Sequence, residues 1–286
     1  MNRRELLIVG SALLFPGLAR AAEPKVERDV VFGAPEGNRL LMDIYRPDTP
    51  GPHPAVILVH GGGWLGGTKE GYLGTGPMLA RNGYVACAIN YRLAPQYPYP
   101  AAFDDCQRAV RWIRAHAKEY DVNPKRVGAM GDSAGGHLVG LMGVRGDTRD
   151  NSDKELSRFS SRPDAVVGYY GAYELVRMWQ IEQAHKPLTA WLGGPPEGHE
   201  EVYRITSPVS MVTRKAPPFL IIHGNKDVVN PEEQSHLFHE ALRKKGVDST
   251  LLILDGVGHG WPADSPQGKQ AEAAVLEFFG KHLLKK

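Results

Sequence analysis

The chain contains 286 residues, of which 42% are hydrophobic and 23% are charged, and its mean hydropathy is −0.32. A chain of this size and composition can bury a substantial core and is expected to fold as one large globular domain. No apolar run reaches the roughly 18 residues that a transmembrane helix needs, which argues against a membrane-spanning protein.

The first 21 residues have a composition of their own. Arg3 and Arg4 precede an apolar stretch from Leu6 to Leu18, and Ala19-Arg20-Ala21 follows it. A charged region, an apolar region and a small-x-small site in this order predict a signal peptide over residues 1–21 and export to the periplasm or beyond. A membrane anchor or a buried first helix fits less well, because glycine and proline interrupt a short segment. The paired arginines also resemble a twin-arginine signal, so both the Sec and the Tat route stay open.

Removal of the signal would change the charge of the chain. Cleavage before Ala22 takes away three arginines and one glutamate, which brings the formal net charge from +2 to 0. A neutral mature chain has no electrostatic reason to bind nucleic acid or an acidic membrane surface, so neither is an expected partner.

From Val26 onward, strand-like patterns alternate with helical ones. The first two strands read as a hairpin, with its turn at residues 35–38. The others are short apolar runs, typical of central strands that are covered on both faces. The expected strands are Val26–Phe32, Leu40–Tyr45, Ala55–His60, Tyr84–Asn90, Arg126–Gly131, Ala165–Tyr170, Phe219–His223 and Thr250–Leu254.

Helical patterns lie between these strands. Apolar residues at helical spacing predict helices over Ala101–Tyr120, Pro231–Lys245 and Lys269–Leu284, and another helix is expected to begin at about Ala134. Strands joined by helical crossovers indicate an α/β fold, with a mostly parallel central sheet of about eight strands and helices on both faces. Residues 22–286 are therefore expected to form one domain.

Two features along the chain leave alternatives open. Residues 172–218 interrupt the strand–helix rhythm with a segment rich in Trp, Tyr, His and Pro, which is either a lid over a site or a surface excursion with its own small core. Cys87 and Cys106 are too few for a disulfide framework and lie in apolar segments. Export would permit a bridge between them, but two buried free thiols are the favoured interpretation.

The stretch GDSAGG, residues 131–136, stands between an expected strand and an expected helix. It contains the G-x-S-x-G pattern, with Gly131 and Gly135 at the glycine positions and Ser133 at the centre. On a sharp strand-to-helix turn this serine would project above the carboxyl edge of the sheet, where open α/β folds bind ligands. We therefore expect Ser133 to be a nucleophile rather than part of a plain glycine-rich turn.

A serine nucleophile needs a base and a group that orients the base. His259 follows the expected strand 250–254 across a glycine-rich loop, and Asp227 follows the strand 219–223. Histidine suits the base because its ordinary pKa of about 6.5 lets it accept and return a proton near neutrality. Asp132 is expected to stabilise the turn, and Asp255 has no motif to support it as the acid.

Other histidines could suggest a metal site. His236 and His239 are three residues apart on an expected helix but lack a third matching ligand, so solvated helix residues are the better interpretation. His137 is expected to be a helix residue packed under the turn. The sequence thus predicts neither a metal nor a cofactor.

The run HGGGW, residues 60–64, follows the strand 55–60. Glycines let backbone N–H groups face a substrate oxygen without a Cβ in the way. Either Gly62 with Gly63, or Gly61 with Gly62, is expected to form an oxyanion hole together with the N–H of Ala134. Trp64 is expected either to flank the acyl side of the pocket or to pack in the core.

Together, HGGGW, GDSAGG, HGNKD and GVGHGW resemble the α/β-hydrolase fold esterases, over the chain from about Val26 onward. YRLAP, residues 91–95, looks like a segment of hormone-sensitive-lipase-like esterases. The acid region, HGNKDVVNPEEQS, is more similar to the bacterial feruloyl/acetyl-esterase-like group, although Asn230 stands where that group often has an apolar residue. The resemblance implies Ser133, Asp227 and His259 as a triad, and ester hydrolysis without a cofactor.

These features predict a secreted serine carboxylesterase that works through an acyl-enzyme. The neutral charge and the signal suggest acetyl or feruloyl esters of plant polysaccharides, so a small-molecule or carbohydrate ester is the expected partner. The same triad could serve an amidase, an arylformamidase or a small peptidase. A non-catalytic binding protein is disfavoured, because the serine, the histidine and the oxyanion glycines are all present.

Overall fold

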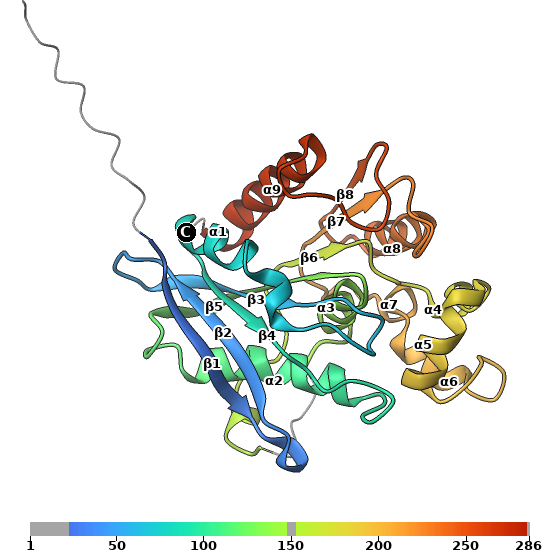
Figure 1. The fold of residues 1–286 in the computed structure, drawn as a ribbon, viewed down its shortest axis with the longest axis horizontal. Helices are drawn as coiled ribbons and strands as arrows, with labels where there is room; N and C mark the ends of the chain where they lie inside the picture. The colour runs from blue at the N-terminus through green and yellow to red at the C-terminus, as the bar shows by residue number, and fades with distance from the viewer. Residues whose placement is uncertain (1–22, 148–152, 285–286) are drawn as a thin grey trace, which may run out of the picture.

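A computed structural model describes residues 23–147 and 153–284 of the chain. A single eight-stranded sheet runs through them in the order β1-β2-β4-β3-β5-β6-β7-β8 (Figure 1). Pairs β1–β2 and β2–β4 are antiparallel, and every other pair is parallel. The strands are β1 Lys25–Gly33, β2 Leu40–Arg46, β3 His53–Val59, β4 Val85–Ile89, β5 Val122–Asp132, β6 Val166–Tyr169, β7 Phe219–Gly224 and β8 Ser249–Leu254. The predicted fold class and the N-terminal hairpin are therefore confirmed.

Helices cover both faces of the sheet. Figure 1 shows α1 and α9 on one side and α2 on the other, while α4, α5 and α6 gather at one end of the molecule. The α-helices are α1 Thr75–Arg81, α2 Ala101–Ala115, α3 Ala134–Arg145, α4 Leu175–Met178, α5 Glu182–Leu192, α6 Glu200–Thr206, α7 Pro208–Met211, α8 Glu233–Lys244 and α9 Pro266–Phe279. Short 3-10 turns span Pro35–Gly37, Lys69–Tyr72 and Leu156–Arg158, and a π turn, Gly280–Leu284, follows α9.

Some predicted bounds were wrong, for local reasons. The helix predicted over residues 101–120 ends at Ala115, where His116 caps it by bonding the carbonyl oxygen of Trp112 through Nδ1 at 2.8 Å. The last helix begins at Pro266 rather than at Lys269, because the Ser265 side chain accepts a hydrogen bond from the Gly268 amide. Helix α1 was not predicted, since it is only seven residues long.

The core consists of two layers, one on each face of the sheet. Strand β3 shows how they arise: Val56 and Leu58 face the layer with α1 and α9, whereas Ile57 and Val59 face the layer with α2 and α3. All four side chains are fully buried, and burial of each contributes about 1.5–3 kcal/mol. This explains why the strand is continuously apolar instead of alternating.

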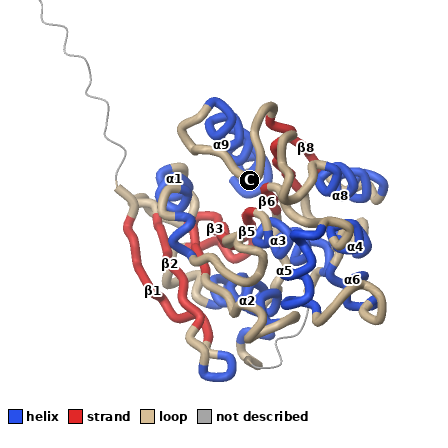
Figure 2. The backbone as a smooth tube through the Cα atoms, turned by 45° about the vertical axis from the view of Figure 1, so that its right-hand side comes forward, coloured by secondary structure: helices blue, strands red, loops and turns tan. Residues whose placement is uncertain are grey.

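Residues 172–218 form α4 to α7 and pack on α3. Trp191 of α5 is fully buried, with its ring centroid 5.2 Å from that of His137 in α3, and Figure 2 shows the two helices side by side. This segment contributes to the main core and, as described below, to the wall of a cavity. The interpretation of this segment as a lid stays one of the two predicted alternatives.

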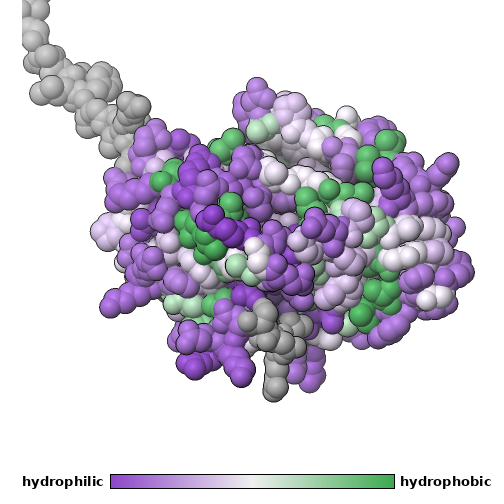
Figure 3. Space-filling view, turned by 60° about the horizontal axis from the view of Figure 1, so that its bottom comes forward, coloured by the Kyte–Doolittle hydropathy of each residue, from purple (hydrophilic) through white to green (hydrophobic). Residues whose placement is uncertain are grey.

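The face in Figure 3 is mostly hydrophilic, with apolar side chains in small separate patches. In the described part of the chain, no helix is long and apolar enough to cross a bilayer. Cys87 and Cys106 are free and buried, as predicted. The predicted signal peptide lies outside the described residues.

Candidate active site

Ser133 occupies a strained turn between β5 and α3. Its φ of 52° and ψ of −118° lie in a region of backbone conformation that residues other than glycine rarely adopt. The turn is tight, since a Cβ on Gly131 would collide with the carbonyl of Gly135, and a Cβ on Gly135 would collide with that of Val59. The Ser133 amide is held by the carbonyl oxygen of Tyr169 at 2.9 Å. The surrounding backbone thus fixes the serine in place.

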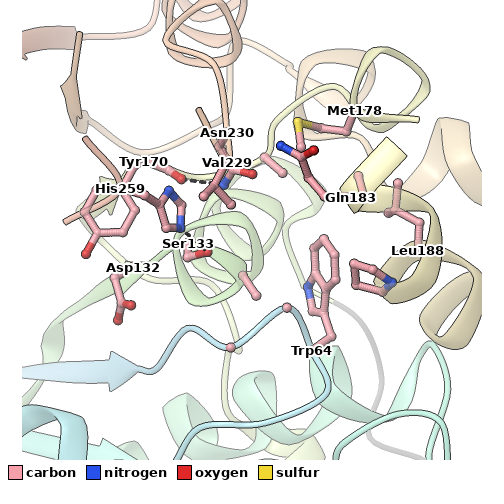
Figure 4. A pocket seen from close by; sticks show the side chains of 16 residues that line it. Trp64, Asp132, Ser133, Tyr170, Met178, Gln183, Leu188, Val229, Asn230 and His259 are labelled. Atoms are coloured by element: carbon pink, nitrogen blue, oxygen red, sulfur yellow. Dashed lines mark hydrogen bonds between the residues drawn. The ribbon is translucent and has the colours of Figure 1, made fainter. Parts of the chain in front are cut away.

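Three loops bring Ser133, His259 and Asp227 together, as Figure 4 shows for the first two. The Ser133 Oγ lies 2.8 Å from His259 Nε2, and His259 Nδ1 lies 2.7 Å from Asp227 Oδ2. Ser133 lies 126 positions before His259 in the chain, and Asp227 lies 32 positions before it. The three residues meet because the carboxyl ends of parallel strands lie at one edge of the sheet. The arrangement allows a proton to pass from the serine hydroxyl to the imidazole.

Asp227 is buried and well supplied with hydrogen bonds. Its Oδ1 accepts from the amides of Val229, at 2.8 Å, and Asn230, at 3.0 Å. Burial by itself would raise the pKa of this carboxyl, but the hydrogen bonds from His223 and His259 outweigh it and hold the pKa far below its usual range. Asp227 is therefore a carboxylate at neutral pH and can orient the His259 ring.

His223 is a member of the site that the sequence analysis missed. Its Nε2 lies 3.1 Å from Asp227 Oδ2 and 2.8 Å from the Asn230 carbonyl oxygen, and both are acceptors. Nε2 must therefore carry a proton, while Nδ1 shares a hydrogen bond with the Ser235 hydroxyl at 2.6 Å. Two imidazoles thus share one oxygen of Asp227. The only sequence signal was the position of His223 at the end of a strand, four residues before the acid.

Tyr170 and Asn230 also support the site. The Tyr170 ring packs against the His259 ring, with the centroids 4.6 Å apart. Asn230 Nδ2 donates to the Tyr170 carbonyl oxygen at 2.7 Å, which joins the acid loop to the end of β6. Asn230, which departs from the family pattern, therefore holds the acid loop against the end of β6.

The predicted oxyanion donors do not all line the same cavity. Gly62, Gly63 and Ala134 line the cavity that contains Ser133, whereas Gly61 lines the neighbouring cleft. Gly62 and Gly63 have φ values of 117° and 59°, which glycine adopts without strain. No described residue accepts a hydrogen bond from these two amides. The geometry therefore favours the Gly62–Gly63 pair over Gly61–Gly62.

Trp64 and His137 connect the oxyanion loop to residues 172–218. The Trp64 ring stacks on Trp191, 4.7 Å between centroids, and its Nε1 donates to His137 Nδ1 at 3.3 Å. His137 Nε2 in turn donates to the Thr206 carbonyl oxygen at 2.8 Å. Burial lowers the pKa of His137 to about 4, so the ring is neutral. Trp64 thus both packs in the core and lines the cavity.

The cavity beside Ser133 has a volume of about 390 Å³. We call it the apolar cavity, because most of the walls away from the serine are hydrocarbon. Those walls come from the oxyanion loop, the residues after β6, α4, α5 and the acid loop, and Figure 4 shows Trp64, Met178 and Leu188 on one side of Ser133. They consist of Trp64, Ala172, Met178, Ala184, Pro187, Leu188 and Val229.

The rejected candidates have other contacts. Asp132 points away from His259 and accepts a hydrogen bond from the Tyr72 hydroxyl at 2.7 Å, which supports its expected role in the turn (Figure 4). Asp255 accepts from Asn225 Nδ2 at 2.7 Å. His239 Nδ1 bonds the Ser249 hydroxyl at 2.9 Å. Among the residues described, no three His, Cys, Asp or Glu side chains are grouped as metal ligands.

The sequence is similar to a known family and to named esterases. The BD-FAE family model matches residues 42–242, more than half of the chain. Esterase LipC of Mycobacterium tuberculosis is 35% identical over 82% of this chain, and the probable carboxylic ester hydrolase LipM of the same organism is 32% identical over 76%. The chain spans 59% and 51%, respectively, of the lengths of these two relatives.

Two solved structures are similar over most of their length. An acetyl ester-xyloside bifunctional hydrolase from Caldicellulosiruptor lactoaceticus has a TM-score of 0.76 and 31% identity, covering 85% of this chain and 87% of its own. Thermogutta terrifontis esterase 2, phosphorylated by paraoxon, has a TM-score of 0.75 and 25% identity, covering 93% and 98%.

Proposed function

The chain belongs to the BD-FAE family of α/β-hydrolase esterases, and from this premise we propose that it hydrolyses carboxylic esters through a covalent acyl-enzyme. The observation that carries the proposal is the hydrogen-bonded chain from Ser133 through His259 to the Asp227 carboxylate. A weak nucleophile is activated in this way by an oriented base.

In the proposed first half-reaction, Ser133 Oγ attacks the ester carbonyl carbon while His259 Nε2 takes the serine proton. The imidazolium then gives this proton to the alcohol oxygen as the C–O bond breaks, and the acyl group stays on Ser133. In the second half-reaction, His259 takes a proton from water as the water oxygen bonds to the acyl carbon. The bond between that carbon and Ser133 Oγ then breaks, His259 returns the proton to Oγ, and the acid is released. Asp227 holds the ring and stabilises its charged form.

The developing oxyanion needs donors. We propose the amides of Gly62, Gly63 and Ala134, which line the cavity at Ser133 and have no acceptor among the described residues. Loss of one such donor typically lowers the rate by roughly 100- to 1,000-fold.

The finer assignment is a secreted enzyme that acts on acetyl or feruloyl esters of polysaccharides. Residues 1–21 support export through their charged, apolar and small-x-small order. The likeness to a hydrolase whose name combines acetyl ester with xyloside supports the substrate class.

The decisive experiment is a comparison of Ser133→Ala with wild type on p-nitrophenyl acetate. We expect kcat to fall by at least about 10⁴-fold, since the variant has no nucleophile. Ser210→Ala is the matched control, because Ser210 is exposed and away from the cavity. Circular dichroism checks that both variants fold. Turnover by folded Ser133→Ala within ten-fold of wild type would refute the assignment.

A further inference from the structure

The wall of the apolar cavity contains a buried amide, the side chain of Asn230. Asn230 is only 6% exposed, and it lines the cavity together with Ser133 and His259. Figure 4 shows it above Ser133, between Tyr170 and Gln183. The neighbouring cleft is lined by neither Ser133 nor His259, so an ester held at the serine must occupy the apolar cavity. The substrate therefore comes against Asn230.

The orientation of the Asn230 amide follows from its contacts. Nδ2 donates to the Tyr170 carbonyl oxygen at 2.7 Å, and because a carbonyl oxygen can only accept, the nitrogen must stand there. Oδ1 is therefore the other arm of the amide, and no described residue donates a hydrogen bond to it. The backbone of Asn230 is held separately, by Asp227 Oδ1 at 3.0 Å and His223 Nε2 at 2.8 Å. The side chain thus keeps an unused acceptor at the cavity wall.

An acceptor in such a place favours a ligand that brings a donor, because a buried polar atom without a hydrogen bond is unfavourable. The wall around Asn230 is hydrocarbon, from Val229, Ala172 and Met178 among others. An ammonium group would lose its hydration against these walls at a large cost, whereas a neutral hydroxyl that donates to Oδ1 would not. The chemistry of the wall therefore favours a hydroxyl group on the substrate.

Asn230 lies close to the reacting atoms. Its amide N–H donates to Asp227, and its side chain binds the carbonyl of Tyr170, whose ring packs against that of His259 at 4.6 Å between centroids. A hydroxyl that reaches Oδ1 must therefore lie within a few carbons of the ester carbonyl. The acyl chain is the part of the ester that suits the hydrocarbon walls beside it, such as Val229.

We propose that the enzyme accepts esters of short hydroxy acids, with the hydroxyl at carbon 2 or carbon 3 of the acyl group, and that Asn230 Oδ1 accepts the hydrogen bond from this hydroxyl. The inference rests on the proposed hydrolysis at Ser133 and concerns the acyl side of the ester. The hydroxyl takes no part in the bond changes. Ser133 Oγ bonds to the acyl carbon, the alcohol leaves with the proton from His259, and water then releases the hydroxy acid.

The test uses pairs of esters in which a hydroxyl replaces a methyl group of similar size. One pair is methyl lactate and methyl 2-methylpropanoate, and the other is methyl 3-hydroxybutyrate and methyl 3-methylbutyrate. The readout is the hydroxyl preference, which is kcat/KM of the hydroxy ester divided by that of its methyl partner, corrected for the rates at which hydroxide hydrolyses the two esters.

Wild type alone already tests the proposal. In a cavity without an acceptor the hydroxyl would lose its hydrogen bonds to water, and the preference would fall to roughly one tenth or less. We expect a preference of about one or more for at least one pair, because Oδ1 replaces the lost water. Preferences clearly below one for both pairs would overturn the proposal.

Asn230→Leu removes the acceptor while it keeps the size of the side chain. We expect it to lower the hydroxyl preference by about ten-fold. Gln183→Leu is the matched control, because this amide also lines the cavity and also donates to a backbone carbonyl, that of Val228 at 2.9 Å, but is exposed to water. We expect its preference to stay within about two-fold of wild type. An unchanged preference in folded Asn230→Leu, or a loss only in Gln183→Leu, would overturn the assignment of Asn230.

A third pair, 2-hydroxyethyl butyrate and propyl butyrate, makes the same exchange on the alcohol. We expect Asn230→Leu to leave this ratio unchanged, and a loss confined to this pair would overturn the assignment to the acyl side. Failure of the ester chemistry itself would appear separately, as activity retained by Ser133→Ala.

Discussion

At Asp227, a single carboxylate oxygen accepts hydrogen bonds from two imidazoles. The proton on His223 Nε2 is fixed by the acceptors around it, and Ser235 satisfies the other ring nitrogen. His259 contacts the Ser133 hydroxyl, whereas His223 is fully buried and held at both nitrogens by groups other than the serine. We therefore infer that His223 positions the carboxylate while His259 moves the proton.

Replacement of His223 tests this positioning role. His223→Leu removes one donor from a buried carboxylate, and a hydrogen bond to a charged group is worth about 1.5–3 kcal/mol. We expect kcat for p-nitrophenyl acetate to fall by about ten- to a hundred-fold with little change in KM. His223→Gln, whose amide can donate to the same oxygen, is expected to recover most of the loss. If both variants lose kcat equally while folded, a general structural role replaces the positioning role.

At this scale, the sequence predicted the residues that motifs single out, and missed those defined by contacts between loops. Ser133 and His259 could be predicted because glycine patterns surround them and a strand precedes each one. His223 and Tyr170 looked like ordinary strand ends, and their contacts depend on how the acid loop folds back over the sheet edge. Single-chain periodicity carries no information about that closure.

Among the elements, residues 172–218 show why a segment between strands was hard to interpret. The sequence left open a lid or an excursion with its own core, and the structure shows a wall that joins the main core. Trp191 is fully buried, and the Thr206 carbonyl accepts a hydrogen bond from His137 of α3. Short helices of four to eleven residues give weak periodicity, so their packing could not be predicted.

The His137 contact makes this packing sensitive to pH. Burial depresses the pKa of His137 to about 4, whereas an unfolded chain has a histidine pKa of about 6.5. Between pH 6.5 and pH 4, His137 is protonated in the unfolded state but stays neutral in the folded state. The contribution of neutral His137 to the free energy of unfolding is therefore fully present above pH 6.5, and about 3 kcal/mol of it is lost as the pH drops towards 4.

Urea unfolding of wild type and His137→Gln at pH 7.5 and pH 4.5 measures this effect. We expect wild type to lose more unfolding free energy between the two pH values than the variant does, because the variant has no group to protonate at this position. Other groups titrate in both proteins and cancel in the comparison. Equal losses in the two proteins would show that His137 does not carry this pH dependence.

For the whole molecule, alternation of strands and helices was sufficient to predict the α/β class and the hairpin. Strand order and register depend on contacts between distant segments. For example, β5 begins at Val122, four residues before the prediction, because it continues past an irregularity to pair with His53 at the start of β3. No local apolar pattern marks residues 122–125, where pairing rather than hydrophobicity maintains the strand.

The two cysteines report on the integrity of the entire fold. Cys87 lies in β4 and Cys106 in α2, both at 0% exposure in the same core layer. Burial raises the pKa of Cys87 to about 12 and that of Cys106 well above its ordinary value, so neither is a reactive thiolate near neutrality. Exposure requires β4 or α2 to leave the sheet, which amounts to unfolding of the core.

Reaction with a thiol reagent such as Ellman's reagent at pH 8 measures this opening. We expect the native protein to show almost no reaction over an hour, and denatured protein to release two equivalents at once, since the chain has two cysteines. In intermediate urea the extent of reaction should follow the loss of circular dichroism. Rapid release of one equivalent from native protein would instead mean that one edge of the sheet opens locally, and that the core does not unfold as a unit.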